Sequence, residues 1–344
     1  MNSILFTEGK IGPLTLRNRT IRSAAFESMC PGNRPSQELF DYHLSVAAGG
    51  VGMTTIAYAA VTQSGLSFER QLWMRPEIVP ELRRLTDAIH HEGAAASIQL
   101  GHCGNMSHRS ICGCMPVGAS SGFNLYSPTF VRGLRKDELP SLAREYGNAV
   151  RLAQEAGFDA VEIHAGHSYL ISQFLSPVYN DRTDEFGGSI ENRTRFCRMI
   201  IDEVRSQIGP HMPIMLRLSA DEFVKGGNTL EDTLKYLEYL NDEVDIFDVS
   251  CGLNDSIQYQ IDANYMKDGW RSYMAKAVKE KFGKPVISMG NYRDPQVVED
   301  TLARGDCDLI GMGRGLIAEP NWVHKVANDQ ECMLRKCISC NIGC

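Results

Sequence analysis

The chain lacks the signals of several large classes of protein. It contains no run of 18 apolar residues, so no membrane span is expected. Its first residues, MNSILFTEGK, lack the basic and apolar regions of a secretory signal peptide. Basic residues are not in excess: the net charge is −7 and the pI about 5.8, which argues against a nucleic-acid partner. We therefore expect a cytoplasmic protein without a membrane or nucleic-acid partner.

A further absence concerns the fold. The motif G-x-G-x-x-G does not occur, which disfavours a doubly wound dinucleotide-binding sheet. Short apolar runs rich in β-branched residues instead alternate with helical patterns, as in a parallel sheet with crossover helices. Eight such strands close a barrel, and one barrel can account for most of 344 residues.

We therefore predict an α/β protein with a single (β/α)8 TIM barrel over residues 1–330 and a cysteine-containing extension over residues 331–344. The predicted strands lie near Ile21–Ala25, Val51–Val61, Ala94–Leu100, Ala160–Ala165, Pro213–Ser219, Val244–Gly252, Pro285–Gly290 and Asp308–Gly313. Predicted helices include Pro76–Glu92, Ser141–Gly157, Ile190–Ile208, Thr229–Asn241 and Pro295–Gly305.

Two segments give no regular pattern. Gly101–Asp137 follows the third predicted strand and is rich in Gly, Ser and Cys, and loops of this length in a compact domain are usually functional. The second is the segment after Glu319, which leaves the barrel and ends in a cysteine cluster. We expect Gly101–Asp137 and the segment Leu253–Trp270 to decide which substrate binds.

Polar side chains gather in the stretch VEIHAGHSYLISQFLSP. Because side chains alternate along a strand, Glu162 and His164 face into the barrel while Val161 faces the outer helices. His164 then lies at the carboxyl end of its strand, where barrel active sites are built, and His167 and Tyr169 follow. Two imidazoles and a phenol can polarise a carbonyl and supply a proton. Ordinary hydrogen-bonded polar residues and a zinc site are the alternatives.

An inward arginine and two glycine turns add to this pattern. Arg217, in PIMLRLS, faces inward and needs an anion or a carbonyl as partner: either a flavin's pyrimidine edge or Glu162 in a structural ion pair. The turns SMGN and GMGR end the seventh and eighth predicted strands, where barrels commonly bind phosphate.

Eleven cysteines without a secretory signal indicate a reducing compartment. Cys337, Cys340 and Cys344 have the close spacing of iron–sulfur or zinc ligands. Four ligands are required and Cys332 is the only nearby spare cysteine, so the site would lack its fourth ligand. Incidental thiols are the alternative.

The motifs HAGHSYLISQFLSP and NDRTDEFGGSIENRTRF resemble the old yellow enzyme family of flavin-dependent ene-reductases, and the resemblance extends from Leu16–Arg19 to Gly315–Trp322. The cysteine tail is similar to the subgroup of 2,4-dienoyl-CoA reductase, 2-enoate reductase, trimethylamine dehydrogenase and bile-acid-modifying flavin enzymes. In that subgroup the barrel precedes a 4Fe–4S cluster and nucleotide-binding domains. The resemblance therefore implies that this chain is the barrel portion of a longer protein, ending at the start of an iron–sulfur segment. A naturally short protein that is reduced by a separate flavin or NADH partner is the alternative.

The resemblance also implies FMN at the barrel mouth. His164 and His167 would bind the carbonyl oxygen of an α,β-unsaturated substrate. The flavin would transfer a hydride to the β-carbon of the substrate, and Tyr169 would protonate the α-carbon. NAD(P)H, through a donor domain or partner, would reduce the flavin. The implied flavin contacts are Ser23, Ala24, Ala25, Phe26, Ala59 and Ala60 mainly through backbone, Gln99 and Arg217 at the pyrimidine ring, and Gly290, Asn291, Gly313 and Arg314 at the phosphate.

Three departures from the family pattern stand out. The stretch Gly101–Asn105 replaces the family's H-x-G-R, Phe26 replaces the cysteine that binds flavin covalently in one branch, and the fourth cluster cysteine is missing. Two other functions remain open: a flavin-dependent amine or alcohol dehydrogenase, and a flavin electron carrier without substrate chemistry.

Overall fold

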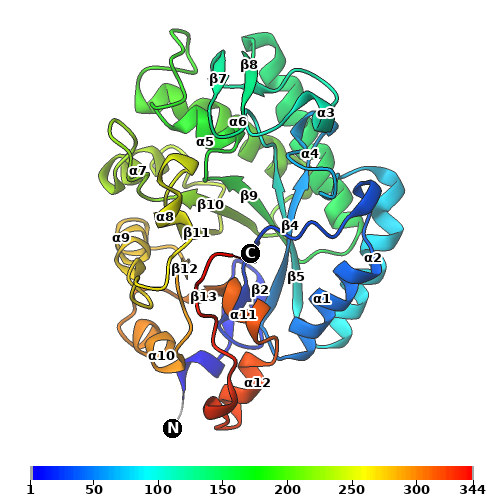
Figure 1. The fold of residues 1–344 in the computed structure, drawn as a ribbon, viewed down its shortest axis with the longest axis vertical. Helices are drawn as coiled ribbons and strands as arrows, with labels where there is room; N and C mark the ends of the chain where they lie inside the picture. Colours follow the sequence, from blue (N-terminus) through cyan, green and yellow to red (C-terminus); the bar gives the residue numbers. More distant parts are fainter. Residues whose placement is uncertain (1–2, 343–344) are drawn as a thin grey trace.

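The strands predicted from the sequence form a closed parallel barrel in the computed structural model, which describes residues 3–342 (Figure 1). Each strand pairs in parallel with its neighbours, and the last closes on the first. The prediction of a single (β/α)8 barrel is confirmed. In barrel order the strands are β3 (Thr20–Arg22), β4 (Met53–Ala60), β5 (Ala95–Gly101), β9 (Ala160–Ala165), β10 (Ile214–Ser219), β11 (Ile246–Ser250), β12 (Val286–Met289) and β13 (Leu309–Met312).

Helices follow the strands and form the outer ring. Several begin with the expected caps: the Ser189 side chain accepts from the Asn192 N–H, and Thr229 forms a capping box with Asp232. The helices are α1 (Gln37–Ala48), α2 (Val79–His91), α3 (Arg109–Cys112), α4 (Leu139–Glu155), α5 (Leu170–Leu175), α6 (Ile190–Ile208), α7 (Leu230–Leu237), α8 (Ile257–Gln260), α9 (Ser272–Phe282), α10 (Pro295–Ala303), α11 (Arg314–Ala318) and α12 (Trp322–Ala327).

The amino ends of the strands are covered by a hairpin that the sequence did not predict. Strands β1 (Gly9–Ile11) and β2 (Leu14–Leu16) pair antiparallel. Ile11 and Leu16 are buried against the first residues of the barrel strands, including Met53 and Ile246. This hairpin closes the end of the barrel opposite the mouth.

The long segment after β5 is more regular than predicted. Besides α3 it contains the small sheet β6 (Val117–Gly118), β7 (Gly122–Asn124) and β8 (Thr129–Gly133), which lies at the top of Figure 1. The prediction of an irregular Gly101–Asp137 is therefore wrong in part. These strands are short, and Phe123 and Phe130 pack against each other on an exposed face, so they lack the buried alternation that identifies a strand.

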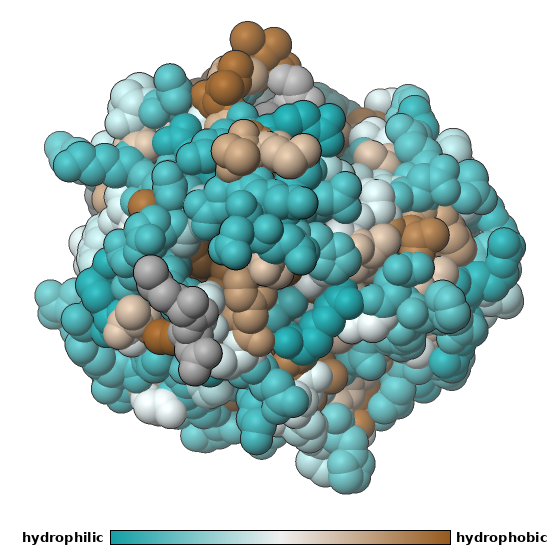
Figure 2. Space-filling model, turned by 90° about the horizontal axis from the view of Figure 1, so that it is seen from below, coloured by the Kyte–Doolittle hydropathy of each residue, from teal (hydrophilic) through white to brown (hydrophobic). Residues whose placement is uncertain are grey.

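Among the described residues, no helix has the length and apolar character needed to cross a membrane. The face of the molecule in Figure 2 is mostly hydrophilic, with apolar residues scattered or in small groups.

Candidate active site

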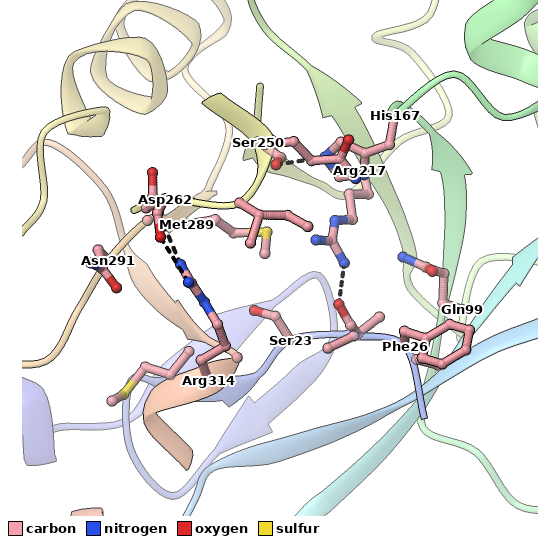
Figure 3. Close-up of a pocket in the computed structure, with 18 of the residues that line it drawn as sticks. Ser23, Phe26, Gln99, His167, Arg217, Ser250, Asp262, Met289, Asn291 and Arg314 are labelled. Atoms are coloured by element: carbon pink, nitrogen blue, oxygen red, sulfur yellow. Dashed lines mark hydrogen bonds and ion pairs between the residues drawn. The ribbon is translucent and has the colours of Figure 1, made fainter. Parts of the chain in front are cut away.

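A pocket lies at the carboxyl ends of the barrel strands (Figure 3). Parallel strands bring residues that are far apart in the sequence to one end of the barrel, which explains why one pocket collects them. Of the residues predicted for the site, the pocket is lined by Ser23, Ala24, Ala25, Phe26, Gln99, His164, His167, Tyr169, Arg217, Gly290, Asn291, Gly313 and Arg314.

Two predicted residues, Ala59 and Ala60, do not line this pocket. From the same strand the pocket receives Ala57 and Tyr58 instead. The pairing of β4 with β5 shifts register after Ile56, so the alternation of side chains changes there. Ala59 and Ala60 are fully buried, and Ala60 exchanges backbone hydrogen bonds with the segment that follows β4.

His164, His167 and Tyr169 converge on one side of the pocket. The ring centroid of His164 lies 5.1 Å from that of His167 and 4.8 Å from that of Tyr169. His167 has a left-handed backbone (φ 59°), its N–H donates to Ser219 Oγ, and its Nε2 lies 2.8 Å from Ser250 Oγ. The strained turn is thus held from two neighbouring strands and directs the second imidazole toward the first.

Burial determines the protonation of these three groups. It holds the pKa of His164 and of His167 well below the usual imidazole value, and the nearby charge of Arg217 lowers both further. Burial raises the pKa of Tyr169 to about 12. At neutral pH the pocket therefore presents two neutral imidazoles and a protonated phenol, a set of donors without positive charge.

Arg217 and Gln99 lie beside this set. Arg217 Nη1 donates to the Ala24 carbonyl at 2.6 Å, and its Nη1 and Nε lie 4.0 Å from Glu162 and 3.9 Å from Asp248. Gln99 donates through Nε2 to Glu162 at 2.6 Å. Arg217 therefore lines the pocket and also lies within ion-pair distance of Glu162, so both readings of this arginine have structural support.

Cations gather at the other end of the pocket. Arg314 Nη1 donates to the Asp262 carbonyl at 2.8 Å, and Arg271 forms a buried ion pair of 2.5 Å with the Asp262 carboxylate. Asn291 and Arg314 lie on the side of the pocket away from Arg217 in Figure 3. Two guanidinium groups beside glycine turns suit a phosphate.

The residues present fit FMN. Several buried polar atoms at the pocket have no hydrogen-bond partner among residues 3–342, although buried polar groups are normally paired. They are Ser23 Oγ, His164 Nδ1, Arg217 Nε, Gln260 Oε1 and Arg271 Nε, and all five residues line the pocket. A polar ligand that extends from Arg217 to Arg271 would satisfy atoms at both ends.

Sequence reasoning missed several residues of the pocket, among them Tyr58, Ser250, Asp262 and Arg271. The ring centroids of Tyr58 and Tyr169 are 4.9 Å apart, and the Ser250 hydroxyl forms a hydrogen bond with His167 Nε2. Their strand positions could have indicated both. Asp262 lies within the segment Leu253–Trp270 after β11, and Arg271 follows it directly. No sequence pattern in this segment predicts which side chains face the barrel.

The cysteine tail folds back over the end of the pocket that carries Asn291 and Arg314. Ser339 is buried and its Oγ accepts a hydrogen bond of 3.0 Å from Asn291 Nδ2, while Asn341 contacts Arg314. Cys337 is half-buried and Cys340 exposed, and Cys344 lies outside the described residues. Within the described part of the chain, no group of three metal-binding side chains comes together. The cluster thus stays a prediction.

Comparison with known proteins identifies the family. The NADH:flavin oxidoreductase / NADH oxidase family matches residues 4–332, nearly the whole chain. The chain belongs to this family. The old yellow enzyme resemblance expected from the sequence is thereby confirmed.

Individual relatives match in sequence along almost the entire chain. The NADH oxidase of Thermoanaerobacter brockii is 36% identical over 99% of this chain and 53% of its own length. The 4,4'-dithiodibutanoate disulfide reductase of Rhodococcus erythropolis is 30% identical over 98% of this chain and 91% of its own.

A solved structure of a 2-naphthoyl-CoA reductase in complex with 2-naphthoyl-CoA superposes with a TM-score of 0.94 at 28% identity. It covers 99% of this chain and 54% of that one. The chain thus spans about half the length of several relatives that it matches.

Proposed function

We propose that this barrel binds FMN and reduces the carbon–carbon double bond of an α,β-unsaturated carbonyl compound. The observation that carries the proposal is the convergence of two neutral imidazoles and a protonated phenol beside Arg217. Neutral donors stabilise an oxygen that gains negative charge, and a phenol can give up a proton. FMN, when bound, supplies the hydride for the β-carbon.

The chain's own groups have separate tasks in this reaction. His164 and His167 donate hydrogen bonds to the carbonyl oxygen, and these bonds strengthen as negative charge develops there. Tyr169 donates its proton to the α-carbon, so the substrate gains one hydride and one proton. Ser250 fixes the His167 ring at 2.8 Å. Arg217 and Gln99 would hold the pyrimidine edge of FMN, and Arg271, Arg314 and Asn291 its phosphate end.

The wider organisation follows from the same proposal. Residues 1–330 would be the FMN barrel and 331–344 the start of an iron–sulfur segment. NAD(P)H would supply electrons through a donor domain or partner, since NADH oxidation is named in a relative 36% identical to this chain.

An amine dehydrogenase is the second candidate, because a histamine dehydrogenase from Rhizobium sp. 4-9 has a similar structure, with a TM-score of 0.88 at 27% identity. An amine cation would favour an aromatic cage or a carboxylate. Tyr58 and Tyr169 could contribute rings. Asp262 is the one carboxylate among the described residues that line the pocket, and it is engaged by Arg271 and Arg314. This charge pattern favours a neutral carbonyl substrate.

One anaerobic experiment separates the candidates. The purified protein should be yellow and release FMN, rather than FAD, on denaturation. After photoreduction, a cyclic enone should reoxidise the flavin, whereas amines should not reduce the oxidised protein. Flavin reduction by an amine, without reoxidation by any enone, would establish the dehydrogenase instead. A flavin that reacts with neither would indicate an electron carrier, and a protein that binds no flavin would contradict the proposal altogether.

A further inference from the structure

Two buried carboxyl groups lie beneath Arg217 inside the barrel. Glu162 is on β9 and Asp248 on β11, the strands on either side of β10, which carries Arg217. Each side chain is at most 2% exposed. Both carboxyl groups lie about 4 Å from the Arg217 guanidinium, and Asp248 Oδ1 has no hydrogen-bond partner among the described residues. None of the tasks assigned above uses this pair.

Charge balance limits how many protons the pair can lose. Arg217 is near both groups, but its Nη1 donates a hydrogen bond to the Ala24 carbonyl rather than to either carboxyl group. Two buried carboxylates with one guanidinium about 4 Å from each would leave a net negative charge in a dry interior. Asp248 Oδ1 also receives no hydrogen bond from the described residues, so an ionised Asp248 would be poorly stabilised.

The surrounding groups agree with one retained proton. Burial and the charge of Glu162 raise the pKa of Asp248 well above the usual value, while Arg217 opposes them. His164 and His167, which line the same pocket as Arg217, have lowered pKa values and add no positive charge. Gln99 donates to Glu162 Oε1 at 2.6 Å, whereas Asp248 Oδ1 receives no hydrogen bond from the described residues.

We propose that Glu162 and Asp248 share one proton and act as positioning residues that set the charge presented to the pyrimidine edge of FMN. The inference rests on the proposed FMN site. With one proton, the pair carries a single negative charge that balances Arg217. Glu162 also orients Gln99: since the Gln99 amide nitrogen donates to the Glu162 carboxyl group, the Gln99 amide oxygen is left to accept from a ring N–H of FMN.

Amide substitutions test the shared proton through the flavin's midpoint potential. In Glu162→Gln or Asp248→Asn, the remaining carboxyl group can ionise, so the charge of the pair and the potential should stay near those of the wild type. The double variant removes the charge, so it should strengthen binding of reduced FMN relative to oxidised FMN about tenfold or more, a rise of about 30 mV for two electrons. Equal rises in each single variant would show that both groups are ionised. A double variant with wild-type potential would refute the charge-setting role.

The infrared spectrum of the apoprotein gives a second readout that does not depend on flavin. The wild type minus either single variant should show a protonated-carboxyl stretch that shifts in D2O. Glu222, whose burial raises its pKa to about 7, is common to all these proteins and cancels in the difference. Absence of the band would overturn the shared proton. Failure to bind FMN would instead refute the proposed function and leave the infrared result to decide the proton.

Discussion

Tyr169 is the residue whose side chain separates the two halves of the proposed reaction. In the proposed reaction its hydroxyl donates the proton to the substrate, but hydride delivery to the flavin does not need it. Tyr169→Phe should therefore slow flavin reoxidation by an enone about 10²–10⁴-fold, the usual contribution of general acid catalysis. Flavin reduction should change little, as stopped-flow measurement of each half-reaction would show.

Tyr236→Phe is the matched control, since Tyr236 is a buried phenol on α7 that does not line the pocket. It should leave both half-reactions near wild-type rates. Equal losses in both half-reactions of Tyr169→Phe would contradict the role assigned to its hydroxyl.

His164 and His167 should decide the binding of phenolate ligands, which place an oxyanion where the substrate carbonyl would lie. The variant His164→Ala/His167→Ala should lose tight binding and the charge-transfer band of such a ligand over the flavin. The exposed His211 provides the control, because His211→Ala leaves the pocket unchanged. Unchanged affinity in the double variant would show that other groups hold the oxygen.

The same two imidazoles should also make stability depend on pH. They stay neutral in the fold, whereas in the unfolded chain they take up protons as pH falls through about 6.5. The free energy of unfolding should therefore decrease as the pH falls below this value, by up to about 1.4 kcal/mol per pH unit for each imidazole. His164→Gln/His167→Gln should take up about two fewer protons on urea unfolding near pH 5. Equal proton uptake by wild type and variant would contradict the neutral state.

At the scale of elements, the strands were predictable and their ends were not. Apolar runs located all eight barrel strands, because a strand buried on both faces has a strong local signature. Strand β3 ends at Arg22 rather than Ala25, since the following residues turn into the pocket. A bulge in β4 brings Tyr58 rather than Ala59 to the pocket. This bulge depends on the pairing of β4 with β5, so the local sequence does not predict it.

The contact between β13 and the segment after β3 gives a prediction about packing. A Cβ on Gly311 would lie 2.5 Å from Ser23 Oγ and 3.0 Å from Met289 Cγ, both at the pocket. Gly311→Ala should lower the free energy of unfolding by about 1–3 kcal/mol through overpacking and should weaken FMN binding. Gly122→Ala, with no atom within 4 Å of its Cβ, is the control. Urea titration and fluorescence quenching would measure both effects, and wild-type FMN affinity in Gly311→Ala would refute the second.

At the scale of the whole molecule, the tail raises the question of the metal. Cys337, Cys340 and Cys344 supply three thiolates, and a 4Fe–4S cluster takes four. The 344-residue chain produced alone should therefore hold fewer than four irons. A longer chain that supplies a fourth thiolate should hold the full cluster and lose it in Cys340→Ser but not in Cys114→Ser, a change in an exposed cysteine. Anaerobic iron and sulfide analysis would measure the cluster content of each protein. The absence of iron from the longer chain would end the cluster hypothesis.

The hairpin β1–β2 has a consequence for the order in which ligands bind. Because it closes the amino end of the barrel, ligands reach the pocket through the mouth, and the tail already covers part of that mouth. A nicotinamide donor and an enone acceptor that both approach the flavin there would exclude each other. Turnover would then follow ping-pong kinetics, with each ligand inhibiting competitively against the other at high concentration. Delivery of electrons through the cysteine tail would bypass this competition, because the donor would no longer need to enter the pocket.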